Sequence, residues 1–600
     1  MDNSNKLELI TSPKSNQFLA NDQRKIFLDY LSKSKNKFKN SDILHLKCHS
    51  FQKTQESLNY SEKCYEEIMN DLTSILNEIH EVNWSKKAWK ILIGPWLIKF
   101  ISIVNDRIEI VQEVLNIKNV NFSYSKEKET FSLASKDIRE FGKKVVNYDW
   151  NDELFSRIFL FLTNQENLQI FYKKKNQLKF NQQDVLININ YLKKIKNFFQ
   201  KKINEKNKYF FFNTYIGNLN NRISLSFKLG EIPVAFEDNL PNFRLQHNFS
   251  LREKLQKLNT NSLDYKQTII RSLIIECLPS LYFENFKNIL NYIKKDSALP
   301  LGKKIIITAN CWGDSYVKFW IAHQSTIGSK VLYLQHGGGY GMIKRLTQER
   351  HENDICDKYY SWGWGKEDKK IYPGMISQTL PLNKKNNSQR ILIVTGTLDY
   401  FQWTSDYLYS IEKEKNLNKS SFFWSVNFID ELLKNTSIPQ KYKNIEIRLH
   451  PLQEKRGSPY SLKKELRTNF PELKFSNHQN KTVIDIIELY DLIVFAYPFA
   501  TPFFQCLALG KPTIAFSPLD KAFIRDSARP DFQKMIDLGI YYDEPKKCAD
   551  FLNKNFKQFD KWNNSLSKEI SNIIKTYANF NRNCQLENLV EFIKFNKFNQ

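Results

Sequence analysis

Histidine and glycine are concentrated in one short stretch of this chain. An apolar run at residues 331–334 is followed directly by Gln335, His336, Gly337, Gly338, Gly339, Tyr340 and Gly341. The chain has only nine histidines and 18 glycines, so the clustering indicates a turn in which a ligand or another segment approaches bare backbone amides. Such a turn after a buried parallel strand could hold an anion and present an imidazole for proton transfer. A tight strand-to-helix turn without a ligand is the alternative.

Two carboxylates near this turn could act as a general base toward an acceptor hydroxyl. Glu352 follows the glycines, and Asp314 follows an apolar run at residues 303–308, at the start of an expected helix. Each has an ordinary alternative, because Glu352 fits a solvated charged turn and Asp314 fits a helix N-terminal charge. We expect the base to be Glu352, Asp314 or His336, in that order.

Polar residues also follow three apolar runs in the C-terminal half. Arg448, His450 and Pro451 close the run that starts at 445; Thr395, Gly396 and Thr397 end the run that starts at 390; and Thr501 comes after residues 492–496. Arginine and histidine at a strand end could hold a nucleotide base, ribose or phosphate. A helix that starts at Thr501 could bind phosphate through its free amides without a metal. The alternatives are incidental polar neighbours of a strand-end proline and a plain N-cap threonine.

The elements that must position these residues alternate between short apolar strands and helices. Expected strands span 303–308, 330–334, 359–365, 390–395, 445–449, 473–475, 492–496 and 513–516, and expected helices span 315–327, 420–434, 481–490 and 501–509. This alternation predicts an α/β protein with parallel, doubly wound sheets. Two such units joined by the polar linker 383–389 would place a ligand cleft between them, at the carboxyl ends of their strands.

Four regions follow from this pattern. Residues 1–264 are expected to be mainly helical and to contribute to the first lobe, and residues 265–382 form its Rossmann-like part. Residues 390–575 form the second, nucleotide-binding lobe, and residues 576–600 form a helical tail. Within the first region, residues 84–107 form an amphipathic segment in which Gly94 and Pro95 mark a kink or a helix start. Residues 151–215 are expected to continue as helical and lysine-rich segments.

Composition limits the classes of partner. The 600 residues carry a net charge of +25, which favours nucleotides, acidic sugars or contact with the anionic inner membrane. Lysine is spread along the whole chain without a nucleic-acid recognition motif, so nucleic acid is not an expected partner. Eight scattered cysteines without a zinc spacing fit a reducing cytoplasm. The most apolar segment, 91–104, is too short to span a membrane and contains Pro95 and Lys99.

Several motifs are absent from the sequence. There is no D-x-D metal pattern, Walker loop, G-x-S-x-G elbow or complete G-x-G-x-x-G fingerprint. These absences argue against kinases, serine hydrolases, dehydrogenases and metal-dependent glycosyltransferases, and no metal site is expected.

The motifs together resemble a family of transferases encoded in bacterial surface-polysaccharide gene clusters. The resemblance lies in residues 335–341, His351, Glu352, Asp357, 361–364, 76–80, Trp89, 94–97, Asp106, Arg107, 448–451 and 500–507. It covers most of the chain, and residues 335–341 and 94–97 are its most specific parts.

That family is similar to glycosyltransferases with two Rossmann-like lobes, the GT-B arrangement. Its relatives move Kdo, sialic acid or related nonulosonates from CMP-activated donors. The resemblance implies that His450 and Pro451 contact CMP and that Thr501 holds its phosphate. Gln505 stands where the family commonly has glutamate, and Ala500 and Pro502 replace hydroxyl residues. A glutamine can accept ribose hydrogen bonds only as a neutral amide.

The leading hypothesis is therefore a metal-independent, cytoplasmic glycosyltransferase that needs no cofactor besides its CMP-sugar donor. It would transfer an acidic sugar to a hydroxyl of a glycan, a lipid-linked glycan or a protein. Gln335, Gly337, Gly338, Gly339 and Gln505 would join the C-terminal residues in binding the donor. One alternative is a CDP-polyol phosphotransferase with a similar two-lobed plan. Another is a non-catalytic assembly factor on a transferase fold.

Overall fold

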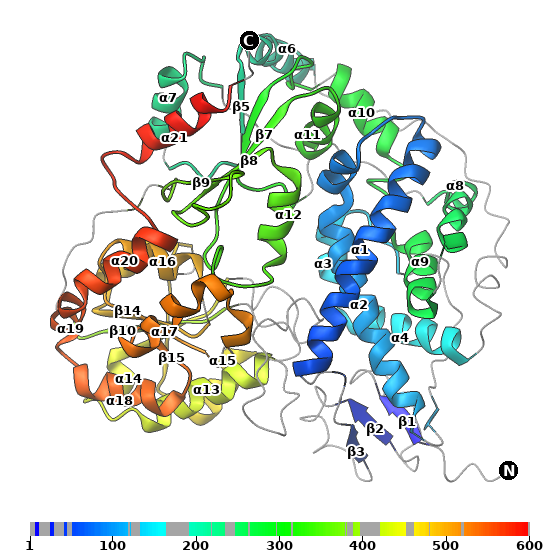
Figure 1. Cartoon of the computed structure of the whole chain (residues 1–600). Coiled ribbons are helices and arrows are strands. Elements are labelled where there is room, and N and C mark those ends of the chain that lie inside the picture. The colour runs from blue at the N-terminus through cyan, green and yellow to red at the C-terminus, as the bar shows by residue number, and fades with distance from the viewer. Residues whose placement is uncertain are drawn as a thin grey trace.

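The computed structural model describes most of the chain (Figure 1). The described residues are 7–10, 25–28, 41–44, 48, 51–117, 120–121, 133–163, 191–217, 219–234, 247–261, 264–295, 297–313, 316–378, 380, 388–396, 421–451, 461–478, 480–497, 499–517 and 521–597.

The first lobe is built on a parallel sheet of largely β-branched and aromatic strands, which are buried except at the edge strand β9. Its order is β5-β6-β7-β8-β9, with every neighbouring pair parallel. The strands are β5 (Tyr209–Phe212), β6 (Ile305–Thr308), β7 (Lys330–Leu334), β8 (Lys358–Ser361) and β9 (Ile371–Pro373), and α11 (Tyr316–Thr326) and α12 (Thr347–Ile355) connect the central ones. Because all strands run the same way, the chain leaves each one at the same edge, and the glycine turn after β7 lies on that edge.

The second lobe repeats this plan with six parallel strands. The order is β12-β11-β10-β13-β14-β15. The strands are β10 (Ile391–Val394), β11 (Ile445–Arg448), β12 (Lys474–Phe475), β13 (Leu492–Phe495), β14 (Thr513–Phe516) and β15 (Tyr541–Tyr542). The helices are α13 (Ser421–Asn435), α14 (Lys441–Asn444), α15 (Leu462–Asn469), α16 (Thr501–Ala508), α17 (Arg529–Asp537), α18 (Pro545–Asn555), α19 (Phe559–Ser565) and α20 (Ser567–Tyr577). The predicted α/β class with two parallel-sheet lobes is confirmed.

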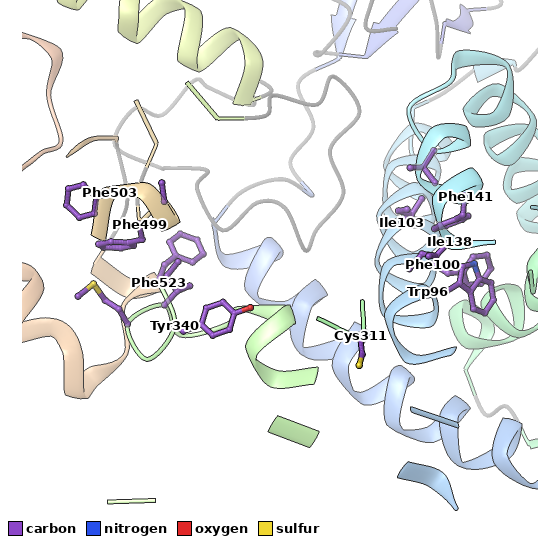
Figure 2. Packing of buried hydrophobic residues seen from close by; sticks show 14 of the residues in the cluster. Trp96, Phe100, Ile103, Ile138, Phe141, Cys311, Tyr340, Phe499, Phe503 and Phe523 are labelled. Atoms are coloured by element: carbon purple, nitrogen blue, oxygen red, sulfur yellow. The ribbon is translucent and has the colours of Figure 1, made fainter. Parts of the chain in front are cut away.

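A helical body packs beside the first sheet. It contains α1 (Phe51–His80), α2 (Lys86–Leu115), α3 (Ile138–Lys144), α4 (Tyr148–Thr163), α6 (Tyr191–Lys206), α8 (Phe249–Glu253), α9 (Tyr265–Cys277) and α10 (Phe286–Lys295). The helix α7 (Leu219–Lys228) lies on the other side of the first sheet (Figure 1). One hydrophobic cluster joins this body to both lobes, and Figure 2 shows Trp96 and Phe100 in the cluster that also holds Tyr340 and Phe499.

The path of α2 differs from the sequence expectation. The helix begins at Lys86 and continues through Pro95, so Pro95 does not start it. The side chain of Ser85 caps the helix by accepting a hydrogen bond of 3.2 Å from the amide of Ala88. Packing on all sides overrides the local cost of an interior proline, because α2 is buried over most of its length. Of the described helices, α2 alone is long and apolar enough to cross a membrane, and 89 % of its apolar window is buried.

Strands that the sequence did not predict complete the sheets. The expectation of helical and lysine-rich segments over residues 151–215 is wrong at β5, which pairs with β6 and forms one edge of the first sheet. A further parallel sheet has the order β3-β2-β1-β4, where β1 is Leu7–Ile10, β2 is Lys25–Leu28, β3 is Ser41–Leu44 and β4 is Val120–Asn121. The expected helix 481–490 is a short 3-10 helix, Ile484–Leu489.

The C-terminal segment returns to the first lobe. After α20, the helix α21 (Gln585–Phe595) packs with α7 over the first sheet, where Leu589 and Phe592 join the cluster that includes Ile305 and Leu332 (Figure 1). The hydroxyl of Tyr360 in β8 donates a hydrogen bond of 2.8 Å to Asn588. The predicted domain boundaries stay predictions.

Candidate active site

The glycine turn is anchored by the side chain of Gln335. Its amide oxygen accepts hydrogen bonds from the backbone of Trp362 at 2.8 Å and from the indole of Trp364 at 2.7 Å. Its amide nitrogen donates to the carbonyl of Gly337 at 2.8 Å. Gln335 is buried, so its polar atoms serve to shape the turn between β7 and α12.

His336 is the polar side chain that this turn presents beside a buried carboxyl group. Its side chain is 18 % exposed, and its Nδ1 lies 3.4 Å from Oε1 of Glu352. Burial lowers the pKa of His336 to about 4, so the imidazole is neutral at pH 7 and has a lone pair free to accept a proton. The ring of Tyr215 stacks on the imidazole with ring centres 5.6 Å apart.

Glu352 lies on α12 beneath the histidine and is buried. The hydroxyls of Tyr340 and Tyr359 donate hydrogen bonds to it at 3.0 and 2.9 Å. Burial raises the pKa of the Glu352 carboxyl well above its usual range, against the opposing effect of the two hydroxyls. A carboxyl group in this position orients the neutral imidazole, whereas His336 is the group with access to an acceptor.

The two lobes meet where the glycine turn contacts the start of α16. The amide of Gly338 donates a hydrogen bond of 3.0 Å to the hydroxyl of Thr501. A Cβ at Gly338 would lie 2.5 Å from the carbonyl oxygen of Phe499, so only glycine permits this approach. Ala500 is the N-cap of α16 and Thr501 is its first residue, so the plain N-cap alternative for Thr501 is wrong.

Two backbone amides of the turn have no acceptor of their own. Within the described part of the chain, neither Gly337 nor Gly339 donates its N–H to a protein group. Gly339 has φ of +79°, the left-handed conformation that occurs in backbone nests for anions. Together with the Thr501 hydroxyl, whose O–H remains able to donate, they form a set of neutral donors suited to an anion.

An ion pair between the buried carboxylate of Glu349 and the partly exposed Arg525 fixes the lobes beside this turn. Glu349 on α12 accepts a hydrogen bond of 2.9 Å from the amide of Gly341 and pairs with Arg525 of the second lobe at 2.5 Å. Burial raises the pKa of Glu349, and the positive charge of Arg525 opposes that effect. The amide of Arg525 also donates to the carbonyl of Met342 at 2.9 Å. These contacts hold the turn and the second lobe in a defined relationship.

The C-terminal candidates line the same edge of the second sheet. Thr395 and Gly396 follow β10, and the amide of Thr395 donates to the carbonyl of Arg448 at 3.0 Å. The guanidinium of Arg448 is buried and donates to the carbonyls of His478, at 2.8 Å, and Lys481. The structure therefore uses Arg448 to brace the loop after β12, while the neighbouring half-buried His450 and the exposed Pro451 follow it on the same edge.

The side-chain amide of Gln505 links the second lobe to Gln378, which in turn contacts the glycine turn. Its Nε2 donates to Oε1 of Gln378 at 2.5 Å, and Gln378 donates to the carbonyl of His336 at 3.3 Å. The structure thus brings Gln505 to the glycine turn. Asp314 and Thr397 lie outside the described residues. Among the residues that are described, no group of three or more His, Cys, Asp or Glu side chains could hold a metal ion.

Some residues of this arrangement were not predicted from the sequence. Tyr215 follows β5 with φ of +52° and its hydroxyl accepts a hydrogen bond of 2.8 Å from Asn310, which follows β6. The position of Tyr215 after an apolar run could have identified it as a candidate site residue, but the sequence analysis did not recognise that run, β5, as a strand. Arg525 and Gln378 carry no local motif, so their roles depend on the packing of the lobes.

Comparison with solved structures gives only weak likenesses. The wall teichoic acid polymerase TagF, H444N variant with CDPG, is 12 % identical, covers 67 % of this chain and 96 % of its own, and has a TM-score of 0.30. A glycosyltransferase from Rickettsia africae is 13 % identical, with coverage of 64 % and 97 % and a TM-score of 0.29. OtsA is 11 % identical, with coverage of 58 % and 86 % and a TM-score of 0.30. At these scores the likenesses assign no residue a role.

Among curated proteins, none matches this chain. The family comparison is decisive for the enzyme class, because one family's sequence model spans residues 7–593, nearly the whole chain. The chain belongs to the LIC12162 family of transferases.

Proposed function

We propose that this transferase is a metal-independent glycosyltransferase that moves an acidic sugar, of the Kdo or nonulosonate type, from a CMP-activated donor to an acceptor hydroxyl. The observation that carries the proposal is the neutral His336 imidazole, backed by Glu352 and placed beside the free amides of Gly337 and Gly339. A cytoplasmic location and the absence of any cofactor besides the donor are part of the same proposal.

His336 acts as the general base in this proposal. Its neutral imidazole accepts the proton of the acceptor hydroxyl as that oxygen attacks the anomeric carbon. The imidazolium that forms is stabilised by the carboxyl group of Glu352, 3.4 Å from Nδ1. Glu352 is a positioning residue because Tyr340 and Tyr359 cover it. This reverses the order expected from the sequence, in which Glu352 came first.

The donor is held by neutral groups. The glycine-turn amides bind the sugar carboxylate, the Thr501 hydroxyl and α16 bind the phosphate, and His450 and Pro451 bind the cytidine. When the glycosidic bond breaks, CMP leaves with the electron pair, and the Thr501 hydroxyl and the N-terminus of α16 stabilise its charge.

A nucleotide screen tests the donor class. CMP is expected to raise the midpoint of thermal unfolding more than UDP or GDP, because a ligand at 100 times its Kd stabilises the folded state by about 2.7 kcal/mol. His450→Ala should abolish the CMP shift. His478→Ala is a matched control, because that residue contributes its backbone carbonyl to Arg448. A UDP or GDP preference, or an unchanged CMP shift in His450→Ala, contradicts the assignment.

Product analysis then separates the reactions that release CMP. Mass spectrometry of the acceptor after incubation with CMP-activated acidic sugars should show addition of one sugar. Transfer of a polyol phosphate from a CDP-polyol would instead establish the alternative phosphotransferase. Binding of CMP without turnover on any acceptor would favour a non-catalytic factor.

A further inference from the structure

The helix α6 has its polar and apolar faces reversed relative to a helix of a soluble domain. Asn197 and Asn204 are among its buried side chains, whereas Phe198 and Phe199 are 58 % and 63 % exposed. Ile195, on the same exposed face, is 39 % exposed. A helix on a protein core normally buries its apolar stripe, so this face is shaped for something outside the chain.

The helix is firmly attached through its polar side, so the exposure is a property of the folded protein. The side-chain amide of Asn204 donates to the carbonyl of Ala298 at 2.9 Å, and the ammonium of Lys201 donates to the carbonyl of Lys294 at 2.8 Å. The ammonium of Lys304 donates to the carbonyl of Glu205 at 2.9 Å. These bonds fix the orientation of α6 and leave the phenylalanines outward.

The helix that carries the exposed aromatic rings is rich in lysine. The sequence of α6, YLKKIKNFFQKKINEK, has six lysines against one glutamate. The ammonium of Lys202 lies 5.8 Å from the centre of the Phe198 ring. Phe595 at the end of α21 is 83 % exposed, and Lys330 at the start of β7 binds the carbonyl of Lys597 just beyond it at 2.8 Å. Exposed phenylalanine among lysines is the pattern of helices that lie in a membrane interface.

We propose that α6 and the end of α21 form a surface that docks this protein on an anionic lipid bilayer. Phe198, Phe199 and Phe595 insert at the level of the headgroups, and the lysines contact anionic lipids. A second copy of this chain is a poor occupant, because two such lysine-rich faces would repel each other. The inference is independent of the donor proposed above.

The location of this surface is compatible with catalysis. It lies at the amino ends of β6 and β7, where Lys304 and Lys330 hold the ends of α6 and α21. The glycine turn leaves the opposite, carboxyl end of β7. In Figure 1, α6 lies at the top of the view, above the strands of the first sheet, and the second lobe lies at the lower left. Docking there leaves the candidate active site open to donor and acceptor.

Vesicle flotation of the full chain without any donor tests the proposal. The protein should float with vesicles of roughly one-third phosphatidylglycerol in phosphatidylcholine, and not with phosphatidylcholine alone, and high salt should weaken the binding. The double variant Phe198→Ser and Phe199→Ser should bind at least about tenfold more weakly. Tyr265→Ser, which changes a 49 % exposed aromatic residue on α9, should bind as the natural protein does.

Three results would overturn the proposal. They are a natural protein that does not float with anionic vesicles, a double variant that floats equally well, and a double variant that loses only a dimer seen by light scattering. Because the substituted side chains are exposed, the double variant should keep its thermal unfolding midpoint and its CMP binding. Failure of vesicle binding therefore leaves the glycosyltransferase proposal unaffected, and failure of CMP binding leaves this one unaffected.

Discussion

The amide of Gly338 donates a hydrogen bond of 3.0 Å to the hydroxyl of Thr501, across 163 residues of sequence. The carbonyl oxygens of Phe499 and Ala500 occupy the space where a side chain at Gly338 would begin. The two lobes therefore touch at the point where the turn after β7 and the start of α16 both offer donors to an anion. The position of His336 relative to the second lobe depends on this contact.

Substitution of Gly338 by alanine should separate the lobes at the active site. The new Cβ would lie 2.5 Å from one carbonyl oxygen and 2.7 Å from the next, and neither backbone group can move freely. We expect kcat/KM to fall about 100-fold or more, the cost of misplacing reacting groups by roughly 1 Å. Far-UV circular dichroism should stay unchanged. Gly302→Ala is the control, because nothing lies within 4 Å of its new Cβ, and equal activity of both variants would contradict this account.

Substitution of Glu352 by glutamine should slow chemistry without affecting CMP binding. Glutamine keeps the size of the side chain and can still accept hydrogen bonds from Tyr340 and Tyr359, but it cannot stabilise an imidazolium at His336. We expect kcat to fall about 100-fold. The pKa of about 4 for His336 predicts that the natural enzyme keeps its base unprotonated down to about pH 4.

The comparison for this prediction is Asp354→Asn on the same helix. Asp354 pairs with Lys90 at 2.8 Å and is 35 % exposed, so its loss tests the general effect of changing α12. A similar loss of kcat in both variants, or a change in CMP affinity for Glu352→Gln, would argue against a specific role for Glu352.

The contact between Gly94 and His351 should transmit a change in α2 to the active site. A Cβ at Gly94 would lie 2.8 Å from the His351 ring and 3.0 Å from the hydroxyl of Tyr65. Since His351 precedes Glu352 on α12, Gly94→Ala should displace that carboxyl group and reduce kcat about tenfold, with overpacking costing about 1–3 kcal/mol of stability. The double variant Gly94→Ala and His351→Ala should recover part of the lost kcat. A double variant no better than the worse single variant would rule out this route.

His351 should make the folded state sensitive to acid. It is buried, burial is the largest cause that lowers its pKa to about 3, and neither ring nitrogen has a hydrogen-bond partner among the described residues. The unfolded chain binds a proton at pH 6.5 and the folded protein does not, so stability falls as the pH drops below that value. The loss at pH 5 is about 2 kcal/mol. His351→Leu should show a smaller difference in unfolding free energy between pH 8 and pH 5, and an unchanged difference would contradict the burial of this ring.

Much of the architecture could be predicted from local patterns. The strands β7 and β14 have the predicted bounds, because continuous apolar, β-branched runs bounded by polar residues occur in strands that are buried on both faces. The same alternation predicted parallel sheets, and the glycine turn was identified by its composition. The strand β5 was missed, since its aromatic run YFFF follows a helix directly and has no turn signal before it.

The sequence by itself determined which segments are strands and helices, and which of them end in residues able to do chemistry, because period and composition are local properties of the chain. Only the tertiary structure decided that the amide of Gly338 contacts the hydroxyl of Thr501 and that the ring of His351 packs against Gly94. It also decided that Glu352 is buried under two tyrosines while His336 keeps access to solvent. Those outcomes depend on contacts between distant segments. Burial, which sets the pKa values of His336 and Glu352, arises only when those segments pack.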